Sequence, residues 1–367
     1  MTSSRMPRPR TCRAQQNFTY LALSDMSGFS AQSESSCLPA YLCLVVKLLT
    51  CRNTPGRPDS LCPTNSAAAW LQESQASHTA RVSGEPLSAV EVQDICDRLR
   101  EDGVRLLSVR GCRLSDRDFG RLCRGVAASR CLAQLNLNLG VVSSIGRASH
   151  LADALAANRS LQTLFLHGSP LLDAGLEALN PALAAHPALV CLDLGDCLLG
   201  DVALALICGM LPPDGAKSGL RELTLSANPR ISTKAWARFS VAVAHSSQLR
   251  VLNLDYNPLG DQIAAMLAVA VASSRTLEVL DLEGTGLTNQ SAQVFLDMVE
   301  NYPTSLRVLV LAENEVSPEL QQQISDLLSE GEEDGREAPP PPGHAPSSPL
   351  QPIRQKPLPW LPHSSKG

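Results

Sequence analysis

The chain has 367 residues, of which 44% are hydrophobic and 18% charged, and its formal net charge is −5 at pH 7. Residues 81–330 contain 20 Lys/Arg and 28 Asp/Glu, a net charge of −8, so this stretch is more acidic than the whole chain. A protein whose main partner is nucleic acid needs a basic face for the phosphates. The charge balance therefore argues against nucleic acid as the partner.

Residues 1–82 contain scattered Ser, Gln and Pro, five cysteines and no period, which predicts a mostly disordered N-terminal extension. The first 24 residues carry Arg and no acidic residue, a feature of mitochondrial transit segments, but Pro7 and Pro9 disfavour an amphipathic helix there. The longest apolar run, residues 37–51, is interrupted by Lys47 and is too short to span a bilayer. We therefore expect no membrane partner.

Residues 83–103 have the pattern of an opening helix. Ser88 suits the N-cap position, and Glu91, three residues later, would complete a capping box. A helix at this point would cover the open end of the repeat array that follows, as solenoids require.

Eight copies of the pattern L-x-x-L-x-L-x-x-(N/C)-x-L follow, at steps of 28 to 31 residues. Two of them, LRVLNLDYNPLG at 249–260 and LEVLDLEGTGLT at 277–288, differ mainly in their polar letters. A fixed period with this consensus indicates a solenoid of stacked repeats. The central leucines are Leu107, Leu135, Leu164, Leu192, Leu223, Leu252, Leu280 and Leu309.

In each copy, apolar and polar residues first alternate, as they do in a half-buried strand. Apolar residues then recur at the spacing of one helical face. A single strand–helix unit cannot bury its apolar face alone, so the units must stack into a parallel sheet that helices cover on one side. Helices are wider than the ~4.8 Å spacing between strands, and the stack must therefore curve. We predict an α/β horseshoe over residues 83–330, with about eight parallel strands on the concave face and helices on the convex face.

The Asn or Cys position of the pattern turns the chain inward after each strand. Asn228, Asn257 and Asn314 are expected to hydrogen-bond the loop backbone there, and losing such a buried partner should cost roughly 1–3 kcal/mol. Three turns depart from the pattern, at Gly140, Ser169 and Thr285. The long fourth unit carries LPPDGAKSG at 211–219, which predicts a loop that extends from the scaffold.

A closing helix and a tail follow the last repeat. Ser317 suits the N-cap of that helix, with Pro318 and Glu319 in its first turn. Residues 331–367 begin with an acidic patch and carry ten prolines between 339 and 362, which predicts a disordered tail, first acidic and then proline-rich. An SH3-ligand pattern, [KR]-x-L-P-x-x-P, is formed there by Lys356, Leu358, Pro359 and Pro362, with an ordinary proline-rich tail as the alternative.

Cysteine usage points to the compartment. Seven of the twelve cysteines lie at core or turn positions of the repeats, no cysteine cluster flanks the array, and the N-terminus lacks a signal-peptide pattern. Reduced thiols in an intracellular protein are therefore favoured over disulfides. We expect a cytoplasmic location, with the nucleus left open.

With a period of 28–29 residues and a full helix in each unit, the array resembles the ribonuclease-inhibitor-like class of leucine-rich-repeat proteins. A closer resemblance, to one leucine-rich-repeat family within this class, covers about residues 83–334 and includes the caps and inter-repeat loops, such as SGEPLS, LTLSANP and ELQQQISDLLSEGEE. It implies an intracellular leucine-rich-repeat protein and carries no biochemical activity with it.

Alternate strand residues should face the concave groove, and at these positions the repeats differ. From the fourth repeat onward the positions accumulate acidic residues, and Phe165 and Tyr256 would be exposed there as aromatic anchors. We predict a docking groove for a protein segment that bears Lys or Arg; an ordinary solvated sheet face is the alternative. The candidate binding residues are Arg110, Phe165, His167, Asp193, Asp196, Asp255, Tyr256, Asp281, Glu283 and Glu313.

No catalytic motif appears in the sequence: it has no G-x-x-x-x-G-K-[ST], G-x-S-x-G, H-E-x-x-H or paired C-x-x-C. We therefore predict no enzyme, no catalytic or metal-binding residue and no cofactor. The leading hypothesis is a monomeric, non-enzymatic scaffold or adaptor that binds a protein. Two alternatives share the fold class, namely a regulator of a small GTPase, like the GTPase-activating proteins of the Ran cycle, and a ligand-sensing domain like those of innate immune receptors.

Overall fold

The computed structural model describes residues 78–211 and 219–330. In these residues, short parallel strands alternate with helices, and the order of strands in the sheet is their order in the sequence. The strands are β1 (Thr79–Arg81), β2 (Leu106–Ser108), β3 (Gln134–Asn136), β4 (Thr163–Phe165), β5 (Cys191–Asp193), β6 (Glu222–Thr224), β7 (Val251–Asn253), β8 (Val279–Asp281) and β9 (Val308–Val310). The helices are α4 (Ala89–Arg100), α5 (Asp116–Ala128), α6 (Ile145–Ala157), α7 (Leu172–Ala185), α8 (Asp201–Cys208), α9 (Thr233–His245), α10 (Gly260–Ser273), α11 (Asn289–Asn301) and α12 (Pro318–Glu330).

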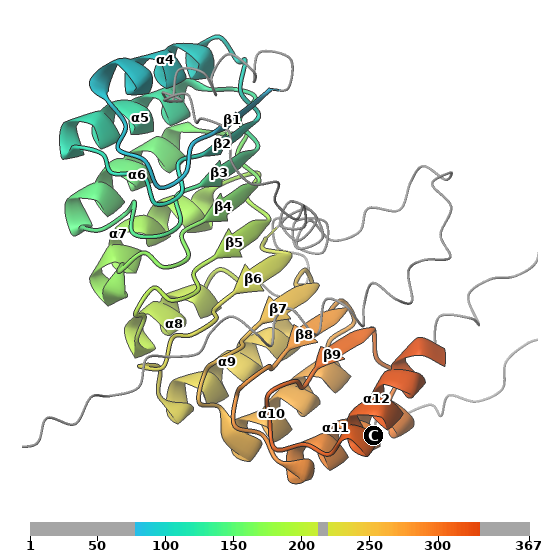
Figure 1. The fold of residues 1–367 in the computed structure, drawn as a ribbon. Helices are drawn as coiled ribbons and strands as arrows, with labels where there is room; N and C mark the ends of the chain where they lie inside the picture. Colours follow the sequence, from blue (N-terminus) through green and yellow to red (C-terminus); the bar gives the residue numbers. More distant parts are fainter. Residues whose placement is uncertain (1–77, 212–218, 331–367) are drawn as a thin grey trace, which may run out of the picture.

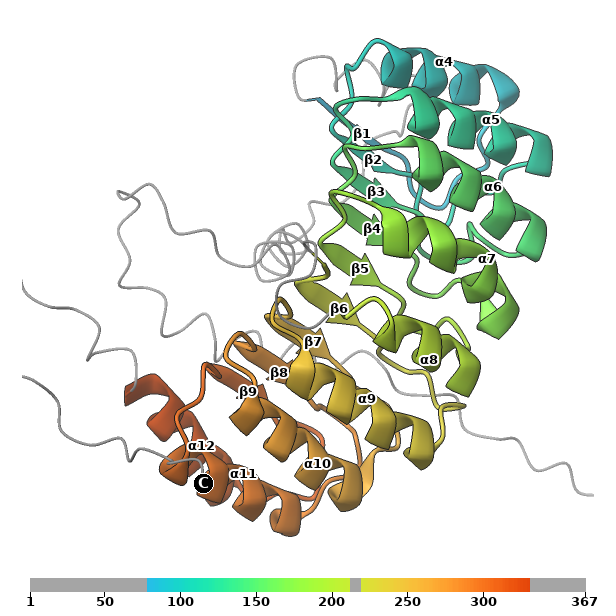
Figure 2. The same cartoon turned by 180° about the vertical axis from the view of Figure 1, so that it is seen from behind.

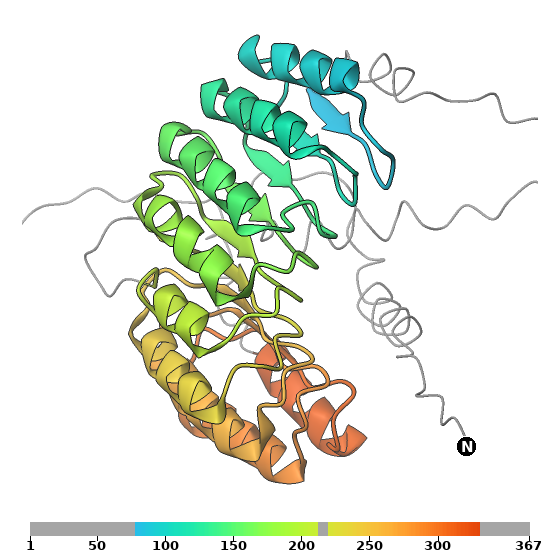
Figure 3. The same ribbon diagram turned by 90° about the vertical axis from the view of Figure 1, so that its left-hand side faces the viewer.

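The units stack into a curved array. Figure 1 shows the strands along the inner side of the curve, and Figure 2 shows the helices from behind, as a layer on the outer side. Figure 3 shows the same two layers from the side. The predicted horseshoe of parallel strands and outer helices is confirmed.

One leucine from each repeat forms the centre of the core. Leu252 in β7 pairs in register with Leu223 in β6 and Leu280 in β8, and each is at most 1% exposed. The parallel register repeats this contact along the sheet, so the core is continuous from unit to unit. The stability of each unit therefore depends on its contacts with the neighbouring units.

The sheet contains one strand more than the eight that the pattern predicts. Ala80 in β1 and Val82 directly after the strand stand where later units have leucines, and Ala80 pairs with Leu107 of β2. Both are buried. Terminal repeats are commonly atypical because they contact one neighbour only. Since these residues are smaller than leucine, the strand does not match the leucine consensus.

The caps and turns follow the predicted chemistry. At the start of α4, the Ser88 backbone N–H donates to Glu91 Oε2 at 2.8 Å, and the Glu91 N–H donates to Ser88 Oγ at 3.3 Å. In the turns, Asn257 Nδ2 donates to the Leu225 and Leu254 carbonyls at 3.0 and 2.8 Å. Where the pattern departs from Asn, Thr285 Oγ1 donates to the Leu282 carbonyl at 2.7 Å and keeps the turn hydrogen-bonded.

Several predicted segments lie outside the described residues: the N-terminal extension as far as residue 77, most of the 211–219 loop, and the tail that carries Lys356, Leu358, Pro359 and Pro362. Among the helices of the described ranges, none has the length and apolar character needed to cross a membrane.

Candidate functional site

Acidic residues occur at the ends of β7, β8 and β9, strands that line the concave side of the array in Figure 1. In each strand the central leucine points into the core, so the residue after it and the residue two further on face the groove. The position directly after these two adds Tyr256 and Glu313. We call the acidic residues at these positions, together with Tyr256, the acidic cluster: it consists of Asp255, Tyr256, Asp281, Glu283 and Glu313.

Asn253 holds the centre of this cluster. It is 3% exposed, and its Nδ2 donates to Asp281 Oδ2 at 3.2 Å across the strand pair. Its Oδ1 accepts from the Asp255 backbone N–H at 2.9 Å, and the Glu283 N–H donates to Asp281 Oδ1 at 3.1 Å. These bonds fix the strand ends and orient the acidic side chains relative to one another.

Tyr256 lies across the turn of the next unit. Its hydroxyl is 2.6 Å from Glu283 Oε1 and 3.1 Å from Glu313 Oε2, so it joins carboxylates of two later repeats. The ring fits because Gly284 has no side chain: a Cβ there would lie 2.8 Å from the ring carbons Cδ1 and Cε1. The hydroxyl has one proton to donate, so it can satisfy only one of the two carboxylates at a time.

This fit predicts a difference between two glycines. Gly284 and Gly286 both have a positive φ, +63° and +74°, but a Cβ at Gly286 would meet nothing within 4 Å. Gly286→Ala should lose about 1–2 kcal/mol of unfolding free energy through backbone strain alone. Gly284→Ala should lose more, since it also displaces the Tyr256 ring. Equal losses in urea denaturation of the two variants would contradict the packing of Tyr256 on Gly284.

A second group lies at the ends of β4 and β5, which β6 separates from the acidic cluster. His167 Nδ1 is 3.7 Å from Asp193 Oδ1, and Asp193 Oδ1 also accepts the Gly195 N–H at 2.9 Å. A Cβ at Gly195 would lie 2.4 Å from His167 Nδ1, so the glycine permits this approach. The Asp193 carboxylate raises the pKa of His167 despite the opposing effect of burial, and Asp196 and Asp255 act in the same direction.

The acidic cluster is electrostatically unfavourable as it stands. Burial raises the pKa of Asp255 to about 6, and the charges of Glu283 and Asp193 add to that rise. Burial and the charges of Asp255 and Glu283 raise the pKa of Asp281 to about 7. The pKa of Tyr256 is also raised, by burial first and then by Glu283 and Glu313.

Among the described residues, the ion pairs of Lys and Arg lie elsewhere, and none of them involves a carboxylate of the cluster. The charge of His167 acts on the cluster, since it lowers the pKa of Asp255. Asp255 is only 9% exposed, and its Oδ1 has no hydrogen-bond partner. No group of metal-ligating side chains suited to a metal ion occurs among the residues that the structure describes. A positively charged group from another molecule would therefore suit the chemistry of this cluster.

The structure brings five of the predicted binding residues together in the acidic cluster and places His167, Asp193 and Asp196 at the ends of β4 and β5. Two predicted residues depart from this arrangement. Arg110 is exposed just after β2, far from β7, β8 and β9 in the strand order. Phe165 is only 5% exposed, so the prediction of an exposed aromatic anchor there is wrong. Its register neighbours are Asn136 and Asp193, and removing an aromatic ring of this size from water is favourable wherever neighbouring groups can cover it. Tyr256, at 38% exposed, remains accessible.

Sequence reasoning also missed the role of Asn253 and Ser226. Ser226 Oγ donates to Asn253 Oδ1 at 3.2 Å, so these two side chains connect β7 to the turn after β6. The signal was present, because both occupy groove-facing positions of the repeat. Their importance lies in cross-strand partners that a single repeat does not reveal.

Comparison with known proteins agrees with the repeat architecture. A "Leucine Rich repeat" family model matches residues 245–268. The chain is 76% identical over 254 residues to the rat and human proteins called leucine-rich repeat-containing protein 73, a match that covers 69% of this chain and 80% of each relative. A solved structure of a TLR13–ssRNA13 complex has 17% sequence identity and a TM-score of 0.37, covering 66% of this chain and 34% of that one. A likeness that weak carries no argument about function.

Proposed function

Because the chain belongs to the family of leucine-rich repeat-containing protein 73 and is built as a repeat scaffold, we propose that it is a non-enzymatic scaffold that binds a protein partner on its concave face. The partner segment carries Lys or Arg and lies against the acidic cluster. The observation that supports this proposal is a set of neighbouring carboxylates that form no ion pair with a Lys or Arg of the described residues.

The cluster offers both an anchor and a steering charge. Asp255 and Glu283 are 9% and 8% exposed, so a cation that reaches them interacts in a poorly solvated place, where charge–charge attraction is strong. Glu313 of the cluster is exposed, as is Asp196 after β5 outside it, and both contribute mainly to the association rate and to specificity. Tyr256 is the accessible aromatic residue of the cluster, and such residues often dominate interface energies.

The test uses the full chain and a fluorescein-labelled octalysine peptide as probe. Asp255→Asn/Glu283→Gln should weaken binding at pH 8 by about tenfold or more. Neutral isosteric changes are preferred to lysine substitutions, since burial of two new charges would itself unfold the site. Fluorescence anisotropy gives the Kd, and circular dichroism verifies the fold of each variant.

A matched control removes two charges outside the groove. Glu177 in α7 and Asp297 in α11 are exposed on the outer helices, so Glu177→Gln/Asp297→Asn changes the net charge by the same amount. Equal weakening by both double variants would mean that only the total charge matters, and the groove proposal would be wrong. An unaltered Kd in the groove variant would also contradict the groove proposal.

The alternatives retain their own tests. A regulator of a small GTPase would accelerate GTP hydrolysis by its GTPase, and a ligand-sensing domain would bind a ligand without a basic segment. The SH3-ligand pattern at Lys356, Leu358, Pro359 and Pro362 lies outside the described residues and stays a prediction.

A further inference from the structure

The two ends of the repeat array carry opposite charge. Residues 81–160 contain 12 Lys/Arg and 9 Asp/Glu, a net charge of +3, whereas residues 161–330 contain 8 and 19, a net charge of −11. The acidic cluster belongs to the second stretch. The first stretch contains a surface with the opposite preference, which the proposed function does not use.

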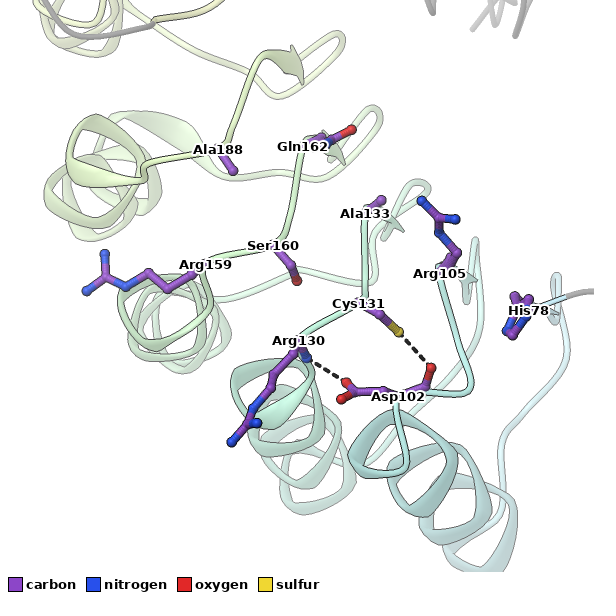
Figure 4. A pocket seen from close by; sticks show the side chains of 10 residues that line it. All are labelled: His78, Asp102, Arg105, Arg130, Cys131, Ala133, Arg159, Ser160, Gln162 and Ala188. Carbon is purple, nitrogen blue, oxygen red and sulfur yellow. Dashed lines mark hydrogen bonds between the residues drawn. The ribbon is translucent and has the colours of Figure 1, made fainter.

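A pocket of about 610 Å³ lies in this basic part, where helices end and strands begin. Figure 4 shows Arg105 on one side of it and Arg130 and Arg159 on the other, with Cys131 and Ser160 between them. The pocket is lined by His78, Asp102, Arg105, Arg130, Cys131, Ala133, Arg159, Ser160, Gln162 and Ala188.

Arg130 is not needed to complete the end of α5. Arginine after a helix often serves the free carbonyls at the helix end, but at the end of α5 Asn158 already does so. Its Nδ2 donates to the Val126 and Ser129 carbonyls at 2.8 and 2.9 Å, and its Oδ1 accepts the Ser160 and Leu161 N–H groups at 2.9 Å. The Arg130 guanidinium is therefore not required at this helix end.

Within the described part of the chain, Arg105, Arg130 and Arg159 take part in no ion pair. Asp102 is the acidic side chain that lines the pocket, and its Oδ1 accepts the Arg130 backbone N–H at 2.7 Å. Cys131 Sγ donates to the Asp102 carbonyl at 2.8 Å, so this residue supports the pocket wall. Three arginines and one aspartate line the pocket, which leaves it with an excess of positive charge. In Figure 4 the arginine side chains extend outward in different directions around the pocket.

We propose that this pocket, defined by Arg105, Arg130 and Arg159, binds a short acidic segment of a protein. Guanidinium groups form two parallel hydrogen bonds with carboxylates, and their separation around the rim suits a ligand with several carboxylates rather than a single anion. A long polyanion such as nucleic acid is less suitable, because the stretch from residue 161 carries −11 and repels it. The site is independent of the acidic cluster and has the opposite charge preference.

Binding of a fluorescein-labelled hexaglutamate peptide to the full chain tests the proposal. Arg105→Gln/Arg130→Gln/Arg159→Gln should weaken the Kd by about tenfold or more. The matched control is Arg117→Gln/Arg124→Gln/Arg238→Gln, which removes three charges from exposed helix positions outside the pocket. The control should bind hexaglutamate like the unmodified chain, and the pocket variant should still bind octalysine, which separates this result from the test of the acidic cluster.

Two results would overturn the proposal. Equal weakening of hexaglutamate binding in the pocket variant and its control would show that binding depends only on the overall charge of the chain. A short single-stranded oligonucleotide that binds more tightly than hexaglutamate, and loses that affinity only in the pocket variant, would assign the pocket to nucleic acid instead.

Discussion

Truncation of Leu252 to alanine is expected to lower the free energy of unfolding by about 2–5 kcal/mol. Leu252 has no exposed surface, and its register neighbours Leu223 and Leu280 are equally enclosed. The parallel strands on either side hold their spacing through backbone hydrogen bonds, so the core cannot easily collapse into the space left by the missing side chain. The loss therefore includes a cavity contribution as well as lost hydrophobic burial.

Urea denaturation followed by circular dichroism measures this loss, and Val308→Ala is the control. Val308 occupies β9 but is 39% exposed, so its truncation should cost below about 1 kcal/mol. Each unit contacts only its neighbours, and a weakened centre could also make the two ends unfold separately. A loss at Leu252 no larger than that at Val308 would contradict a continuous core through β7.

The strands and caps could be predicted from sequence because they depend on neighbours along the chain. The alternation around each central leucine locates a strand, and Ser88 with Glu91 locates a helix start within one turn. β1 escaped this reasoning because Ala80 and Val82 occupy positions where the consensus demands leucine. The strand is recognised only through its pairing with β2, whose residues lie far from it along the sequence.

The acidic cluster could be predicted only as a set of positions. Alternation identified Asp255 and Glu283 as groove residues, but their burial depends on side chains from adjacent repeats. Likewise, the reach of Tyr256 to Glu313 depends on the absence of a side chain at Gly284. Arg105, Arg130 and Arg159 stand outside the repeat consensus, and only the stacking of three units assembles them into one pocket.

Replacing Asp255 and Asp281 together with asparagine is expected to stabilise the protein at pH 8 and to leave its stability nearly unchanged at pH 4. The folded-state pKa values, about 6 and about 7, lie above the ordinary value of 3.8. At pH 4 both carboxyls are protonated in the folded protein and about half protonated in the unfolded chain, so little of the charge penalty is present. As the pH rises from about 4 to 7 the unfolded chain ionises more readily than the folded protein, so stability falls and then levels off above pH 7.

The gain from the asparagine pair should be about 2–4 kcal/mol at pH 8, since each pKa unit corresponds to about 1.4 kcal/mol and the two sites interact. Urea denaturation at pH 4, 6 and 8 measures it. Asp201→Asn provides a control of opposite sign, because hydrogen bonds from Ser232 lower the pKa of Asp201 and this carboxylate stabilises the fold when ionised. Asp201→Asn should therefore lose stability at pH 8. A flat pH profile for the asparagine pair would show that the two carboxyls are well solvated.

The same substitutions should act in the opposite direction on binding. A lysine or arginine of the partner favours the ionised forms of Asp255 and Asp281, so the unmodified chain should bind octalysine more tightly at pH 8 than at pH 5. The asparagine pair should lose most of this pH dependence while it gains stability. Such a trade-off would explain why a sheet face retains buried acids that weaken its own fold. Stabilisation without loss of octalysine binding would place the binding surface elsewhere on the array.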